Sequence, residues 1–204
     1  MNAVNAVNAV SVSTLREGVR EAYSRAAEHP GEDHPFPVGR KFAESVGYPA
    51  DLLRRLPAVS VEVFAGVANL SILAEIFSGA TVLDMGCGGG LDSIIAARRT
   101  GPEGQVFAVD FSSAMLTCAK QGLMEAGVNN ARIYSADAER LPIEDNSVDV
   151  ALANGIFNLN PERSMIFSEL ARVVKPGGCV YAAELILRED FEEEVQATAA
   201  NCLA

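Results

Sequence analysis

The sequence lacks tryptophan, and histidine and cysteine are scarce, with 2 and 4 residues in a chain of 204. No two cysteines form a C-x-x-C pair, so neither a zinc site nor a disulfide framework is indicated. We therefore expect no bound metal, and we expect reduced thiols, as in a cytoplasmic protein. Both histidines, His29 and His34, lie in a proline-rich stretch, which makes them poor candidates for catalysis.

Basic residues are also few. Lysine and arginine number 16 against 27 aspartates and glutamates, which gives a net charge of −11. Nucleic acid is not an expected partner, because a phosphate backbone requires a clustered basic face. No apolar run is long and pure enough to span a membrane, and the Asn-Ala-Val repeats at residues 2–10 lack the basic and apolar regions of a secretory signal.

The first 80 residues differ in pattern from the rest of the chain. We expect a flexible tail over residues 1–12, a helical N-terminal segment over 13–80, a core over 81–187 and an acidic tail over 188–204. Within the N-terminal segment the pattern predicts helices ending at Glu28, over 40–46 and over 49–56, and a longer helical run within 61–77.

From Thr81 onward, apolar segments alternate with helical patterns. Strands are predicted at 81–85, 105–109, 131–135, 148–153 and 179–187. Three helices are predicted between these strands. The first runs from the glycines to Thr100, and the second begins at a cap at Ser112 or Ser113 and ends at Gly127. The third begins at Pro161, directly after a cap at Asn160. This alternation is typical of an α/β fold with a doubly wound, mostly parallel, Rossmann-like sheet of about five strands.

A glycine cluster follows the first predicted strand, at Gly86, Gly88 and Gly90. The dinucleotide pattern G-x-G-x-x-G requires a glycine at position 91, which is Leu91, and no P-loop pattern is present. Asp84 would repel a pyrophosphate but suits an ammonium group. A phosphate-free ligand made of a nucleoside and an amino acid therefore fits better than a dinucleotide, and a dehydrogenase with an atypical loop is the weaker alternative.

Two further acids end the second and third strands. Asp110 can accept both hydroxyls of a ribose, and Asp137 can accept from an adenine amino group while the Ala138 N–H donates to a ring nitrogen. Phe111 and Met115 can cover the faces of the adenine. Each acid also has a simpler explanation, Asp110 as a helix cap and Asp137 as a surface acid.

These motifs together resemble the class I S-adenosylmethionine-dependent methyltransferases over residues 81–187. The matching segments are VLDMGCGGG at 82–90, VDFS at 109–112, ADAERLP at 136–142 and LARVVKPGG at 170–178. The resemblance implies that S-adenosylmethionine is the cofactor, with Asp84, Gly86, Cys87, Gly88 and Gly90 at its methionine end. It further implies Asp110 at the ribose, Asp137 at the adenine and Asn154 at the methionine moiety.

Within this superfamily the segments NSVDV at 146–150, NGIFNL at 154–159 and VGY at 46–48 with LP at 56–57 look most like the arsenite methyltransferases. The resemblance implies a group of enzymes that hold trivalent arsenic through cysteine thiolates. Two of the cysteine positions fall here at about Ala65 and at Gly155, and only Cys202 matches a thiol position. A soft metalloid requires several thiolates, so we expect a different, unidentified small-molecule acceptor. No catalytic residue is assigned. The alternative is a protein that binds S-adenosylmethionine but is inactive or depends on a partner, with a sensing or interaction role.

The family usually continues with two further strands, which this sequence lacks after the fifth. The outer edge of the fifth strand is then expected to be unpaired, and an open apolar edge favours association. The N-terminal helices, the C-terminal tail or a second copy in a homodimer are the expected covers of this edge.

Overall fold

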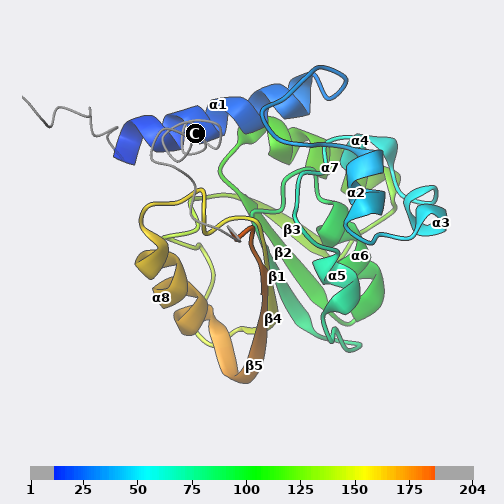
Figure 1. Cartoon of the computed structure of the whole chain (residues 1–204). Coiled ribbons are helices and arrows are strands. Elements are labelled where there is room, and N and C mark those ends of the chain that lie inside the picture. Colours follow the sequence, from blue (N-terminus) through cyan, green and yellow to red (C-terminus); the bar gives the residue numbers. More distant parts are fainter. Residues whose placement is uncertain (1–11, 187–204) are drawn as a thin grey trace, which may run out of the picture.

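A five-stranded, wholly parallel sheet lies at the centre of the computed structural model, which describes residues 12–186 (Figure 1). The strands are β1 Thr81–Met85, β2 Gln105–Asp110, β3 Ala131–Ser135, β4 Val148–Asn154 and β5 Val174–Ala183. Their order is β3-β2-β1-β4-β5, so the α/β fold predicted from the alternating pattern is confirmed. Some predictions concern residues that the structure does not describe. They are the C-terminal tail at 188–204, which includes Cys202, and the N-terminal tail at 1–12 apart from Val12.

Helices cover both faces of the sheet (Figure 1). The helices on one face are α5 Leu70–Leu73, α6 Leu91–Thr100 and α7 Ser113–Glu125, and α8 Arg163–Val173 lies on the other. Neighbouring side chains of β1 point to opposite faces, as a strand requires: Val82 packs with residues of α5 and α6, and Leu83 packs with residues of α8. As predicted, Ser112 caps α7, because its side chain accepts from the Met115 N–H.

The N-terminal helices lie beyond the sheet. The longest, α1 Val12–Glu28, crosses above the carboxyl ends of the strands (Figure 1). The short helices α2 Arg40–Ser45, α3 Ala50–Leu53 and α4 Ala58–Val61 follow. Tyr48, Leu53 and Phe64 join this segment to α6 and α7 through one apolar cluster that includes Ile94 and Leu123. The N-terminal segment therefore packs directly against the helices that flank the sheet.

The longer helical run predicted within residues 61–77 is wrong. The structure has only the single turns α4 and α5, with irregular backbone at 64–69 between them. The cause is Asn154 at the end of β4. Its Oδ1 accepts from the N–H groups of Val67 and Ala68 at 2.8 and 3.1 Å, and its Nδ2 donates to the Ala68 carbonyl at 2.7 Å. This side chain satisfies backbone groups that would otherwise pair within a helix.

Two predicted boundaries are also wrong. Helix α8 begins at Arg163 rather than Pro161, because Asn160 Oδ1 accepts from the Glu162 N–H at 2.8 Å and forms a turn first. Strand β5 spans 174–183 rather than 179–187. Its pairing with β4 shifts between Val174 and Cys179, so the Lys-Pro-Gly-Gly sequence forms an irregularity within the strand rather than a loop before it.

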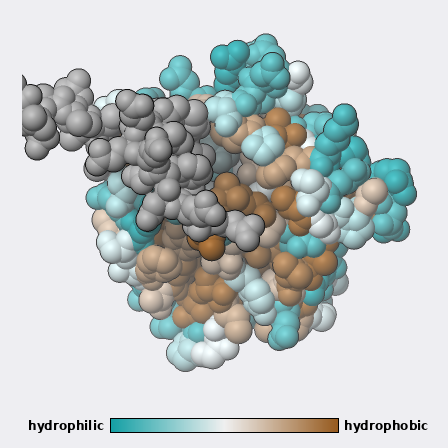
Figure 2. Space-filling model, in the orientation of Figure 1, coloured by the Kyte–Doolittle hydropathy of each residue, from teal (hydrophilic) through white to brown (hydrophobic). Residues whose placement is uncertain are grey.

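Strand β5 pairs with β4 on one side, and among residues 12–186 no strand pairs with its other side. Beside it, a groove between α8 and β5 is lined by apolar side chains, and Phe167 and Val180 are 57% and 44% exposed. Apolar surface is visible over this part of the molecule in Figure 2. None of the described helices has both the length and the apolar character needed to cross a membrane.

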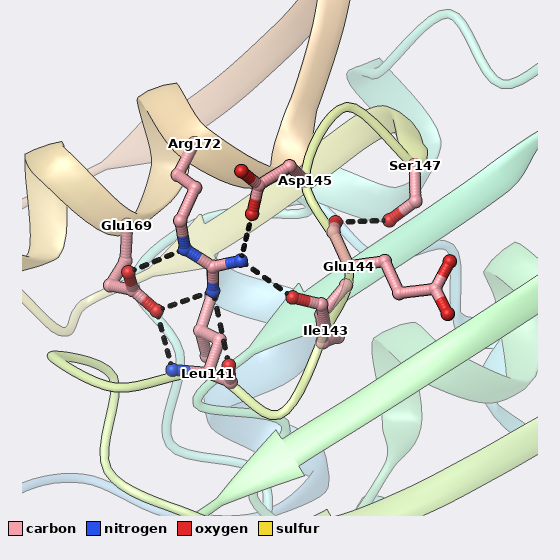
Figure 3. Close-up of polar contacts among 7 residues, drawn as sticks. All are labelled: Leu141, Ile143, Glu144, Asp145, Ser147, Glu169 and Arg172. Atoms are coloured by element: carbon pink, nitrogen blue, oxygen red, sulfur yellow. Dashed lines mark hydrogen bonds and ion pairs between the residues drawn. The ribbon is translucent and has the colours of Figure 1, made fainter.

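Arg172 in the last turn of α8 anchors the loop between β3 and β4 (Figure 3). Its guanidinium donates to the carbonyls of Leu141 and Ile143 at 3.1 and 2.7 Å, and to Asp145 at 2.7 Å. Glu169 holds the guanidinium through two bonds of 2.7 Å and also accepts from the Leu141 N–H at 2.6 Å. One arginine–glutamate pair thus satisfies several backbone groups of a loop that has no regular structure.

We expect Arg172→Gln to lower the free energy of unfolding by about 1–3 kcal/mol, because it leaves loop carbonyls and Glu169 without their charged partner. Urea denaturation measures the change. The matched control is Arg163→Gln on the same helix, whose side chain is exposed and whose loss should cost less than about 0.5 kcal/mol. Equal stabilities for the two variants would contradict the anchoring role.

Candidate functional site

The loop between β1 and α6 bends sharply around its glycines. Gly88 has φ +50° and Gly86 has φ +75°, a region that side-chain-bearing residues rarely adopt. A Cβ at Gly86 would also collide with the side chain of Ile156. The loop backbone is therefore held close to the ends of β1 and β2, as the sequence pattern predicts for a turn that approaches a ligand.

Asp110 at the end of β2 is buried and binds this loop. Its Oδ2 accepts from the Gly88 N–H at 2.9 Å and its Oδ1 from the Ser112 N–H at 2.8 Å. Burial raises the pKa of Asp110, although these two bonds favour the ionised form. Asp110 thus connects the glycine loop to the start of α7, and each of its oxygens retains acceptor capacity.

Asp84 near the end of β1 is buried beside a second acid, Asp92, in the first turn of α6. Burial, and then the charge of Asp92, raise the pKa of Asp84 to about 8, although the Ser93 hydroxyl donates to it at 2.5 Å. Burial also raises the pKa of Asp92. Two buried carboxyls without a cation resist ionisation together, so a positively charged ligand group would favour the ionised form of Asp84.

Two adjoining pockets open at the carboxyl ends of the strands, and they share Gly86, Asp110 and Phe111. The glycine-loop pocket lies between this loop and residues 63–66, with Asp84 and Asp92 in its wall. The β3 pocket, about 580 Å³, lies beside Asp137 and Ala138. This is the edge at which parallel sheets bind ligands.

The residues predicted around an adenine lie at these two pockets. Phe111 lines both, Met115 lines the glycine-loop pocket, and Asp137 and Ala138 line the β3 pocket. Asp137 is half exposed and forms an ion pair of 2.8 Å with Arg16 of α1. The structure therefore brings these side chains to one cleft, with a cation at Asp137 that the sequence gave no reason to expect.

Asn154 and Cys87 also line the glycine-loop pocket. The side chain of Asn154 is committed to the backbone at 67–68, as described above, and donates its second hydrogen to Asp92 at 3.1 Å. The Cys87 thiol is buried, and burial raises its pKa. Both side chains thus shape the pocket wall, and a thiol that resists ionisation is a weak nucleophile.

Sequence reasoning missed the residues that reach the site from distant parts of the chain. Tyr48 and Ser71 both donate their hydroxyls to Asp92, and Tyr23 of α1 lines the glycine-loop pocket. Asp92 lies in the first turn of a helix, where an acid needs no functional explanation. No local pattern marks Tyr23, because its position depends on how α1 packs over the sheet.

The two pockets differ in charge. The residues that line the glycine-loop pocket include Asp84, Asp92 and Asp110 but no lysine, arginine or histidine. The β3 pocket adds Arg16, which also lies 3.2 Å from Glu139 Oε1. The cleft can therefore hold a neutral or cationic group beside the loop, and its carboxylate oxygens can accept hydrogen bonds from a ligand.

Known proteins resemble this chain in sequence and in fold. A family model described as a methyltransferase domain matches residues 76–204. An arsenite methyltransferase of Halobacterium salinarum is 32% identical over 196 residues, which cover 89% of this chain and 50% of that protein. A demethylmenaquinone methyltransferase of Listeria welshimeri is 38% identical over 107 residues, which cover 52% of this chain and 45% of that protein. The chain thus spans about half the length of these curated relatives.

Among solved structures, an arsenic(III) S-adenosylmethionine methyltransferase from Chlamydomonas reinhardtii superposes with a TM-score of 0.60 at 25% identity. The match covers 82% of this chain and 56% of that one. A match of this extent reaches beyond residues 81–204 into the part of the chain before Thr81.

The raised pKa of Asp84 predicts a pH-dependent stability. Between its ordinary value of about 4 and its folded value of about 8, the folded state retains a proton that the unfolded chain has lost, so the free energy of unfolding falls as pH rises. We expect Asp84→Asn to remove this pH-dependent loss of stability and to raise the melting temperature at pH 8 by at least about 5 °C, with little gain at pH 4.

Thermal denaturation between pH 4 and pH 8 measures this difference. The exposed Asp51→Asn is the control, and its melting temperature should follow that of the unmodified protein. A constant difference between Asp84→Asn and the unmodified protein across this range would show that Asp84 ionises normally.

Proposed function

The chain belongs to the family of S-adenosylmethionine-dependent methyltransferase domains, and we propose that it transfers a methyl group from S-adenosylmethionine to a small-molecule acceptor. The observation that carries the proposal is the placement of Asp84 and Asp110, both buried, on either side of the glycine loop at adjoining pockets. This arrangement suits a ligand with an ammonium group and a ribose but no phosphate.

We assign the nucleoside to the cleft around β2 and β3. Asp110 would accept the ribose hydroxyls with the oxygen capacity that its bonds to Gly88 and Ser112 leave free. Asp137 and the Ala138 N–H would form hydrogen bonds with the edge of the adenine, and Phe111 and Met115 would cover its faces. Arg16 binds one oxygen of Asp137 and would hold the carboxylate in place.

We assign the methionine end to the glycine-loop pocket. Asp84 would bind the ammonium group, and Gly86, Cys87, Gly88 and Gly90 would allow the ligand to approach the backbone. Asn154 contributes indirectly in this proposal, because its side chain holds residues 67–68 at the edge of the same pocket. When bound, S-adenosylmethionine supplies an electrophilic methyl group, and the chain contributes mainly by holding the two reactants in line.

The acceptor would enter beside residues 63–66 and Gly155. Ala65 and Gly155, the positions at which the arsenite methyltransferase resemblance places thiols, both line this pocket. Neither provides a ligand for arsenic, so we propose an acceptor that is not a thiophilic metalloid. Because the pocket wall carries three acids and no basic side chain, the acceptor would be neutral or cationic, with a nucleophile that needs no strong base.

Two further proposals concern the setting of the protein. We propose a cytoplasmic location, because Cys87, Cys118 and Cys179 are free thiols in the structure. We also propose that a second copy covers the outer edge of β5, since the exposed Phe167 and Val180 form an apolar surface next to this edge, which pairs with no other strand among residues 12–186. Backbone pairing between two such edges would extend the sheet.

Titration calorimetry followed by turnover assays tests the proposed function. We expect S-adenosylmethionine and S-adenosylhomocysteine to bind and NAD not to bind. With a panel of neutral and cationic nucleophiles, together with arsenite, we expect methylation of a nucleophile other than arsenite. Binding of NAD alone would contradict the proposal. Binding of S-adenosylmethionine without turnover on any acceptor would favour the alternative, an inactive or partner-dependent binding protein.

Light scattering coupled to size exclusion tests the dimer. We expect a dimer mass for the unmodified protein and a monomer mass for Val180→Lys, because a charge on the edge strand opposes pairing. The control is Met124→Lys on α7, where the side chain is 74% exposed and lies outside the proposed interface. A constant monomer mass up to high concentration would contradict the dimer.

A further inference from the structure

Helix α1 is fastened across the mouth of the cleft by three polar contacts. Arg16 pairs with Asp137 at 2.8 Å, and the guanidinium of Arg20 lies 5.4 Å from the centre of the Phe111 ring. The hydroxyl of Ser24 lies 3.0 Å from that of Ser112, the cap of α7. All three contacts reach residues at the carboxyl ends of β2 and β3, so α1 forms a roof over the proposed cofactor site.

Between these contacts, Tyr23 projects into the site. It lines the glycine-loop pocket, and its ring stacks on Phe36 with 4.4 Å between the ring centres. Its hydroxyl forms no hydrogen bond with the other residues that the structure describes. Burial and the charges of Asp110 and Glu184 raise the pKa of Tyr23, so the hydroxyl stays protonated and can donate.

The carboxylate of a methionine moiety needs hydrogen-bond donors in this pocket, and the glycine loop offers few that are free. The pocket wall holds no lysine, arginine or histidine, as noted above. Four of the five loop N–H groups already donate within the protein: those of Gly86 and Cys87 to Val109, that of Gly88 to Asp110 and that of Gly90 to Cys87. The Gly89 N–H is the exception among them, and one N–H group does not satisfy a carboxylate.

Side-chain donors are equally scarce. Both amide hydrogens of Asn154 are committed, one to the Ala68 carbonyl and one to Asp92. The hydroxyl of Ser60 has no hydrogen-bond partner among the described residues, but it is buried and directed toward α7, since a Cβ at Gly122 would collide with its oxygen. Of the described side chains around the pocket, Tyr23 is therefore the one with a strong donor that is not already committed or directed elsewhere.

We propose that the Tyr23 hydroxyl binds the carboxylate of the methionine moiety, so that α1 closes firmly only over a ligand that carries the amino-acid part. The inference rests on the proposed function and adds a ligand-binding role for the N-terminal segment. A nucleoside without the amino acid would still contact Asp110 and Asp137, but it would leave Tyr23 without its partner. Helix α1, through Tyr23, would thus bind the complete cofactor more tightly than its nucleoside fragments.

Calorimetry with two ligands tests this role. S-adenosylhomocysteine carries the carboxylate, and 5′-methylthioadenosine shares its nucleoside and sulfur but lacks the amino acid. We expect Tyr23→Phe to weaken binding of S-adenosylhomocysteine roughly tenfold or more, since it removes one hydrogen bond to a charged group. Binding of 5′-methylthioadenosine should stay within about twofold, because the ring and its packing on Phe36 remain.

Tyr134→Phe is the matched control, because Tyr134 packs against Phe107 away from both pockets and should affect neither ligand. Hydrogen exchange adds a second readout. S-adenosylhomocysteine should slow exchange in α1 of the unmodified protein, whereas 5′-methylthioadenosine, or either ligand with Tyr23→Phe, should slow it much less.

The outcomes separate this inference from the proposed function. If the unmodified protein binds neither ligand, the proposed function fails. If it binds both and Tyr23→Phe leaves S-adenosylhomocysteine affinity unchanged, the role of Tyr23 is refuted while the cofactor site stands. An equal loss for both ligands would also overturn the inference, because it would place the hydroxyl at the nucleoside or in the packing of α1.

Discussion

The site depends on the burial of carboxylates without a counter-cation at the carboxyl ends of the central strands. Asp84 and Asp92 share one buried region, and Asp110 lies across the glycine loop from them. Hydroxyl and N–H donors stabilise these groups, but burial still raises the pKa of each of them. Such a cluster is unfavourable for folding unless a ligand supplies positive charge, and this cost agrees with the ammonium site that we propose.

The rest of the fold supports this cluster from two sides. On one side, Arg172 and Glu169 hold the backbone at Leu141, in the loop that follows the β3-pocket residue Asp137 (Figure 3). On the other side, α1 is attached through exposed or half-buried contacts such as Arg16 with Asp137. Contacts of this kind are weak individually, which suits an element that has to open for a ligand to enter.

Much of the core could be predicted from the sequence because its signals are local. The strand, the glycine turn and the helix from Thr81 to Thr100 each leave a local pattern, and the family resemblance drawn from them is confirmed. The helical run expected within 61–77 failed because a distant side chain, Asn154, determines the backbone there. Tyr23 could not be predicted as a site residue because its position also depends on a long-range contact: the packing of α1 brings it to the pocket.

The central claim is that Asp84 is protonated in the free site and ionises when an ammonium group binds. The most direct test is calorimetry of S-adenosylhomocysteine binding at pH 7 in two buffers that differ in their heat of ionisation. Because burial and the charge of Asp92 raise the pKa of Asp84, the account predicts that binding of the ammonium group releases a proton, and hence a binding enthalpy that depends on the buffer. The same enthalpy in both buffers would mean that no proton is released, and would contradict the account.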